Sequence, residues 1–154
     1  MSLLNRLKSM GAGFYLLLAS LILTIVGFIY FFLTFNTFSY SYDKFVIALT
    51  IIAIYGTLFL LINGFLAGDR PRLVSIFYVI NVFALMISFA YFLIPCLSPI
   101  GILFTVNMGD METYAKGVPL CFVGVGCYVI AVILTVIAAF FPMIKKKAGE
   151  QYEF

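Results

Sequence analysis

Four long apolar runs dominate the hydrophobic pattern of the chain, and none of them contains an acidic or basic residue. The runs cover approximately residues 11–35, 45–67, 73–94 and 120–144. Each is close to or above the roughly 20 residues that a helix needs to cross about 30 Å of hydrocarbon. The pattern therefore predicts an all-α integral membrane protein, with residues 1–154 forming one membrane domain of four spans.

The connection between the second and third runs is a short segment, residues 68–72. Gly68 suits the end of one helix and Pro71 the first turn of the next, so these two spans should lie side by side and antiparallel. Residues 63–72 also resemble the loop after the second span of major facilitator transporters, but the loop's spacing is not kept and those proteins have twelve spans. We interpret the segment as a turn and expect an antiparallel four-helix bundle.

The composition and charge of the chain agree with a membrane protein and predict its orientation. Of the 154 residues 65% are hydrophobic and 10% are charged, whereas soluble domains carry roughly 25% charged residues. Seven Lys and Arg residues fall on the side of the two termini and two on the other side: Arg6, Lys8, Arg70, Arg72, Lys145, Lys146 and Lys147, against Lys44 and Lys116. The positive-inside rule then places both termini, including the tail 145–154, in the cytoplasm. Basic charge beside spans indicates orientation and anionic lipid, not nucleic acid.

Small and weakly polar residues recur along each run at intervals of three, four or seven, which places them on one face of each helix. Helices in a bilayer associate through close packing of such residues, because lipid tails are as apolar as Leu. We expect them to form the packed seam of the bundle: Gly13, Ser20, Gly27, Thr57, Gly64, Asn81, Ser88, Gly124 and Ala131. Phe59 and Ile133 fall on other faces and are expected to contact lipid.

Asn63 and Asn81 are the most polar side chains within the runs. They could line a polar path through the bundle. In the simpler interpretation, which we favour, each forms a hydrogen bond with a neighbouring helix that is typically worth about 0.6–2 kcal/mol.

The chain offers little of the chemistry that membrane enzymes and ion-coupled transporters use. Acids and bases inside the membrane mark proton relays and coupled-ion sites, and the four runs contain none. The chain has no His, and its cysteines, Cys96, Cys121 and Cys127, form no C-x-x-C pair. We therefore expect no catalytic, cofactor-binding or metal site.

The longest segment outside the runs is the loop 95–119, expected on the outer side. Its central part has β-branched and aromatic residues at 102–106, a turn-like sequence at 107–110 and a more polar stretch at 112–115, which together predict a small β-hairpin. In this hairpin Cys96 falls opposite Cys121, and counting twenty residues along the spans also places both near the outer surface. A disulfide there would be worth about 3 kcal/mol; the alternative is two free thiols and a loop that re-enters the lipid.

These features favour a non-catalytic membrane protein, an accessory subunit or organiser that binds lipid and another membrane protein or a second copy of itself. The outer loop 97–119 is the expected contact surface, with Asp110, Glu112 and Tyr114 as candidate contact residues. One alternative is an oligomeric pore, or an uncoupled transporter, with a neutral lining of Ser, Thr and Asn; the other is an enzyme of unrecognised type. The chain has no N-x-S/T sequence for glycosylation, which favours a bacterial plasma membrane.

Overall fold

The computed structural model describes residues 3–41, 43–67, 71–105 and 111–142, and every regular element in these ranges is an α-helix. The helices are α1 (Leu3–Lys8), α2 (Ala12–Thr37), α3 (Lys44–Ala67), α4 (Pro71–Thr105) and α5 (Met111–Ala138). The four long helices are apolar enough to cross a membrane, over residues 12–37, 44–66, 74–102 and 112–138. The prediction of an all-α, four-span antiparallel bundle is confirmed: this is a multi-pass integral membrane protein.

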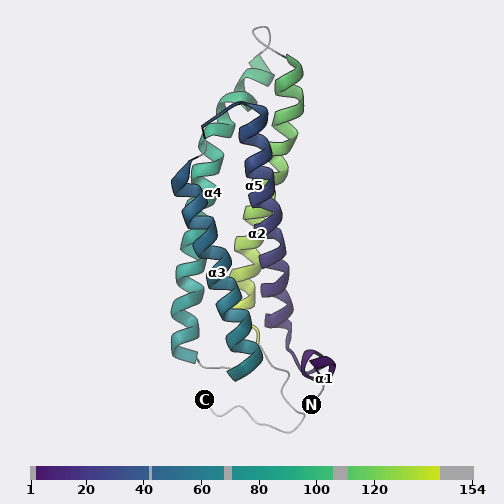
Figure 1. Ribbon diagram of the computed structural model, residues 1–154, viewed down its shortest axis with the longest axis vertical. Coiled ribbons are helices and arrows are strands. Elements are labelled where there is room, and N and C mark those ends of the chain that lie inside the picture. Colours follow the sequence, from purple (N-terminus) through teal and green to yellow (C-terminus); the bar gives the residue numbers. More distant parts are fainter. Residues whose placement is uncertain (1–2, 42, 68–70, 106–110, 143–154) are drawn as a thin grey trace.

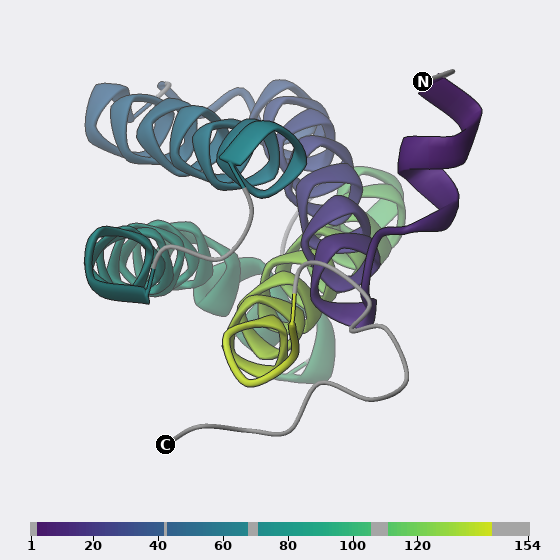
Figure 2. The same ribbon diagram turned by 90° about the horizontal axis from the view of Figure 1, so that it is seen from below.

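The four long helices run alternately up and down the long axis of the molecule (Figure 1). We call the end that holds α1, the starts of α2 and α4 and the ends of α3 and α5 the base, and the opposite end the tip. The most extensive contact joins α2 to α5; α4 contacts both α3 and α5, and α2 contacts α3 less. Figure 2, seen along the bundle from the base, shows α1 lying outside the bundle next to α2.

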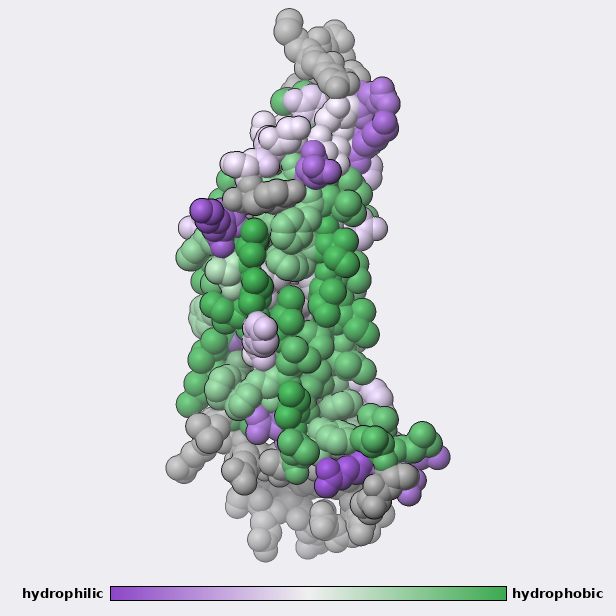
Figure 3. All heavy atoms as spheres, in the orientation of Figure 1, coloured by the Kyte–Doolittle hydropathy of each residue, from purple (hydrophilic) through white to green (hydrophobic). Residues whose placement is uncertain are grey.

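The outer surface of the bundle is suited to lipid. Hydrophobic side chains cover most of the middle of the face seen in Figure 3, and hydrophilic side chains gather toward its two ends. Large apolar side chains such as Ile22, Ile62 and Ile133 are half or more exposed within the spans. Since this surface is unfavourable in water, the four helices contact the bilayer.

The structure corrects the predicted ends of the third and fourth spans. The helix of the third span, α4, continues beyond residue 94 to Thr105, and the helix of the fourth span, α5, begins at Met111. Most of the expected loop 95–119 is therefore helical. The β-hairpin prediction is wrong, because residues 102–105 and 112–115 lie within α4 and α5; its turn, 107–110, lies outside the described residues. A two-stranded hairpin alone is only marginally stable, whereas extending two helices that already pack together adds hydrogen bonds and contacts at each residue.

Three prolines inside the helices made the segment 95–119 resemble a loop. Pro95 and Pro99 lie within α4, and Pro119 lies within α5. Each removes one backbone hydrogen bond and favours a bend, but neighbouring helices make such residues acceptable in membrane helices. In Figure 1 the upper part of α4 leans toward α5, which keeps the two helices together beyond the ends of α2 and α3.

At the base, α5 ends at Ala138, earlier than the predicted residue 144. The chain then turns: the amide of Phe141 donates to the carbonyl of Ala138 at 3.2 Å, and the carbonyl of Pro142 accepts from the amide of Gly13 at 3.2 Å. The start of α2 and the residues after α5 are thereby joined. The predicted cytoplasmic tail, 145–154, lies outside the described residues.

Candidate functional site

The turn between α2 and α3 is built by a Schellman motif at the end of α2. The amide of Tyr40 donates to the carbonyl of Phe35 at 2.9 Å, and the amide of Ser39 donates to the carbonyl of Asn36 at 3.2 Å. Ser39 has a φ of 55°, in the left-handed region that this motif requires and that Gly usually occupies. Asp43 begins α3 by accepting a hydrogen bond from the amide of Phe45 at 2.8 Å.

This turn packs onto the tip of α5 through aromatic side chains. The ring of Phe38 lies directly over Gly117, where any side chain would collide with it. Its centroid lies 5.9 Å from that of Tyr114 and 5.5 Å from that of Tyr40. Partial burial, and then the nearby Tyr114, raises the pKa of the Tyr40 hydroxyl. These contacts attach the tip of α5 to the rest of the bundle.

Residues 95–105 of α4 and 111–119 of α5 form the projecting hairpin, our name for the ends of these two helices at the tip. Its inner part packs beside the α2–α3 turn, and its outer part extends beyond α2 and α3 (Figure 1). At 35 residues α4 is about 52 Å long, against about 39 Å for the 26 residues of α2. Of the predicted contact residues, Glu112 is exposed and pairs with Lys116 at 2.6 Å, and Tyr114 is half-buried against Phe38. Asp110 lies outside the described residues.

A groove of about 590 Å³ lies beside the projecting hairpin, between the α2–α3 turn and α4. Tyr40, Ser41 and Asp43 line it on one side, and Tyr91, Pro95 and Ser98 line it on the other. Because it combines aromatic rings with a carboxylate and hydroxyl groups at the end of the bundle, this groove offers a mixed polar and apolar contact surface.

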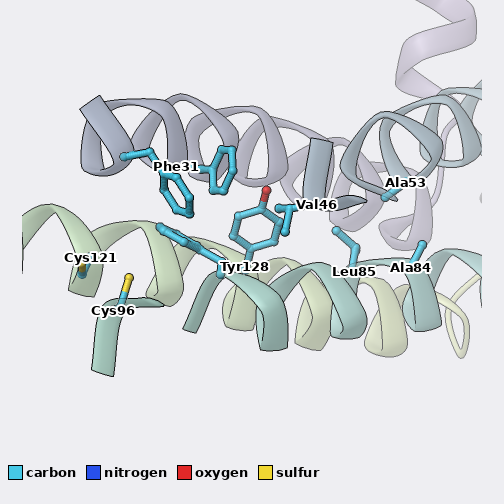
Figure 4. Close-up of a cluster of buried hydrophobic side chains, with 10 residues drawn as sticks. Phe31, Val46, Ala53, Ala84, Leu85, Cys96, Cys121 and Tyr128 are labelled. Atoms are coloured by element: carbon cyan, nitrogen blue, oxygen red, sulfur yellow. The ribbon is translucent and has the colours of Figure 1, made fainter. Parts of the chain in front are cut away.

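Cys96 and Cys121, predicted to form a disulfide, face each other between α4 and α5 (Figure 4). Both are buried free thiols, close enough for a hydrogen bond between them. The hairpin that suggested their pairing is absent from the described residues, but the two antiparallel helices bring them to the same level. The bond itself stays a prediction. Cys127 is a third buried free thiol, on the face of α5 that packs against Gly27.

The nine residues expected in the seam are all buried in the bundle: Gly13, Ser20, Gly27, Thr57, Gly64, Asn81, Ser88, Gly124 and Ala131. The glycines permit the closest contacts between helices. A methyl group added at Gly27 would lie 3.1 Å from the ring of Tyr128, and one added at Gly124 would lie 2.6 Å from the ring of Phe92.

Buried hydroxyl and amide groups join the helices at three places. Between α2 and α5, the hydroxyls of Ser20 and Thr135 lie 2.6 Å apart. Between α3 and α5, the hydroxyls of Thr50 and Tyr128 lie 3.0 Å apart. Between α3 and α4, Asn81 donates through Nδ2 to Thr57 Oγ1 at 2.6 Å. The interior of the bundle is therefore polar at several levels without carrying a charge.

The two asparagines have different roles. Asn81 bonds a neighbouring helix, as expected, but its Oδ1 atom has no hydrogen-bond partner among the described residues. Asn63 instead donates to the carbonyl of Phe59 in its own helix at 3.0 Å, and its expected bond to another helix is not found among the described residues.

Two contacts between helices, those of Tyr128 and Gly56, were not predicted from the sequence. Tyr128 is fully buried against Phe92 and Thr50, yet its four-residue spacing from Gly124 could have placed it on the seam. Gly56 was not part of any predicted stripe, and it lies against Asn81 because that side chain crosses from the next helix.

Comparisons of the chain with protein families, curated proteins and solved structures found no match.

Proposed function

We propose that this protein is a non-catalytic membrane subunit, an organiser that binds another membrane protein or lipid through its tip. The observation that carries the proposal is the projecting hairpin, which extends beyond α2 and α3 as two packed helices. Phe38 and Tyr40 brace it from the side. A braced helical surface loses little conformational entropy when a partner binds.

The chemistry of the described spans supports binding over coupled transport. Their buried polar groups are uncharged, and Ser20, Thr57 and Thr135 are at most 1% exposed. Ion-coupled transport normally needs an ionisable group within the membrane. A neutral pore would need such hydroxyls to face a lumen, and those of Ser20, Thr57 and Thr135 instead bond to a neighbouring helix or to their own helix. The hydroxyls of Thr34 and Ser88 have no hydrogen-bond partner among the described residues, but they too are buried between helices.

We propose further that the base faces the cytoplasm and the tip faces outward, in a bacterial plasma membrane. Arg6 and Lys8 lie in α1 at the base, and Arg72 lies in the first turn of α4, also at the base. The tip carries Lys44 and Lys116, the latter paired with Glu112. The excess of basic residues at the base supports this orientation.

The proposal is tested by shortening the projecting hairpin. Residues 102–115 are replaced with a short glycine–serine turn, and the proteins that co-purify in mild detergent are compared quantitatively with those of the wild type. We expect the bundle to keep its melting temperature while a defined membrane protein or lipid is lost. The control is Ile133→Ala, an exposed apolar position in the last turns of α5, far from the hairpin, that should retain the partner. A shortened protein that keeps every partner would refute the role of the tip.

A further inference from the structure

A second groove lies on the lipid-facing side of the bundle, between α3 and α4. Its volume is about 630 Å³, and its walls are mainly apolar, with Ile52, Phe59, Ile62 and Phe77 among them. Gly56, on its floor, is almost equally far from Lys44 and Ala67 at the two ends of α3. The groove is therefore at the middle depth of the bilayer, far from the water on either side.

Two polar side chains line this otherwise apolar groove, and the first is Asn81. It is 2% exposed, and its Nδ2 atom donates to Thr57. Its Oδ1 atom is near Gly56, where an added methyl group would lie 3.1 Å away, and has no hydrogen-bond partner among the described residues. An amide oxygen without a donor is costly in hydrocarbon, because no water can replace the missing bond.

The second polar side chain is Tyr55, which is 68% exposed on the same groove. Tyr residues of membrane proteins are enriched at the two interfaces, where the hydroxyl reaches water. Tyr55 is instead at the centre of α3, and no hydrogen bond from the described residues reaches its hydroxyl. The groove thus presents a hydrogen-bond donor and a hydrogen-bond acceptor, each lacking a partner.

We propose that this groove is the interface of a homodimer, in which the Tyr55 hydroxyl of each copy donates to Asn81 Oδ1 of the other. The twofold axis is perpendicular to the membrane, so both copies have the same orientation. Such an axis preserves depth, and donor and acceptor are at similar depth, because Tyr55 precedes by two residues, about 3 Å along the helix, the Thr57 that Asn81 binds. Oδ1 is buried in the single copy, so the dimer requires a rotation of the Asn81 carboxamide, about its soft terminal torsion, that turns Oδ1 toward the groove.

A second copy of this chain fits the groove better than a lipid does. An acyl chain could fill the apolar walls, but it carries no donor at this depth and would leave both Tyr55 and Asn81 unpaired. In a twofold dimer each copy supplies one donor, the Tyr55 hydroxyl, and one acceptor, Asn81 Oδ1, so two equivalent hydrogen bonds form. Ile52 and Ile62, about half exposed on either side of Tyr55 along α3, would pack at the same interface.

The test measures dimerisation by fluorescence energy transfer between donor- and acceptor-labelled copies in liposomes, over a dilution series of protein in lipid. Tyr55→Phe removes only the hydroxyl, and because both bonds are lost it should weaken the dimer on the order of tenfold. Ile62→Trp should abolish dimerisation by filling the groove from a surface position that does not affect the fold. The matched controls are Ile22→Trp, equally exposed on α2, and Tyr30→Phe, which removes a hydroxyl from α2 outside both grooves.

Loss of energy transfer in the two groove variants, with both controls unchanged, supports the interface. A protein that stays monomeric at every dilution overturns it, and so does a dimer that Tyr55→Phe and Ile62→Trp leave intact. Native mass spectrometry adds a further outcome: a monomer carrying a lipid that Ile62→Trp releases would assign the groove to lipid and overturn the dimer. None of these results bears on the tip, whose proposed partner is tested separately.

Discussion

Adding a single methyl group at Gly124 should destabilise the bundle, because the position has no space for it. A methyl group there would lie 2.6 Å from Phe92 Cε1, whereas ordinary contact begins near 3.4 Å, so the ring must move by about 0.8 Å. The ring is fully buried, and its centroid is 5.4 Å from that of Phe31 and 5.9 Å from that of Tyr128. Since these neighbours restrict its movement, Gly124→Ala should cost about 1–3 kcal/mol of unfolding free energy.

The matched control is Gly126→Ala, two residues along the same helix. A methyl group at Gly126 meets nothing within 4 Å. Both substitutions gain the same helix propensity, up to about 1 kcal/mol, so the difference between the two variants isolates the contact with Phe92. The free energy of unfolding is measured in mixed micelles by titration with a denaturing detergent.

A double-mutant cycle shows whether the cost arises at Phe92. Phe92→Leu shortens the side chain that the new methyl group meets, so Gly124→Ala should cost less in that background, with a coupling energy of about 0.5–3 kcal/mol. If Gly124→Ala is as stable as Gly126→Ala, to within about 0.5 kcal/mol, the packing argument at this position is refuted.

Three further predictions follow. Under oxidising conditions Cys96 and Cys121 should form a disulfide, which lowers the intact mass by two hydrogen atoms and leaves only Cys127 to react with a thiol reagent after unfolding; three reactive thiols would contradict it. In a background without native cysteines, Lys116→Cys should react with an impermeant reagent added outside cells and Arg6→Cys should not, and the reverse pattern would invert the orientation. In proteoliposomes, a proton gradient should drive no uptake of solutes, because no acidic or basic side chain is buried within the described spans, and a gradient-dependent flux would refute this expectation.

The spans and the buried seam could be predicted from the sequence because two strong physical constraints act on them. The thickness of hydrocarbon sets the length of each run, and close packing in lipid selects small residues at helical spacing. Ser20, Gly27 and Gly124 are therefore recognisable from their spacing alone, and the structure buries all three.

The tip could not be predicted because its residues have conflicting preferences. Ile102 and Thr105 are β-branched, and Pro99 and Gly117 commonly mark loops, but β propensity is weak and depends on context. The contact of α4 with α5, and that of Phe38 with Gly117, outweigh these preferences. Each of these contacts joins two different helices or a helix and a turn, and so does the contact between Gly56 and Asn81, which no pattern within one helix reveals.

The extensive contact between α2 and α5 has a consequence for biosynthesis. Among the four long helices, α2 is synthesised first and finds its main partner in α5, which is synthesised after the other three. Translation at about 5–20 residues per second takes roughly 5–20 seconds for the 100 or so residues from the end of α2 to the end of α5. For that interval the face of α2 bearing Gly13, Ser20 and Gly27 has no α5 to pack against. An insertase or chaperone that binds helix faces of small and polar residues within the membrane would bind this face of α2 until α5 packs against it.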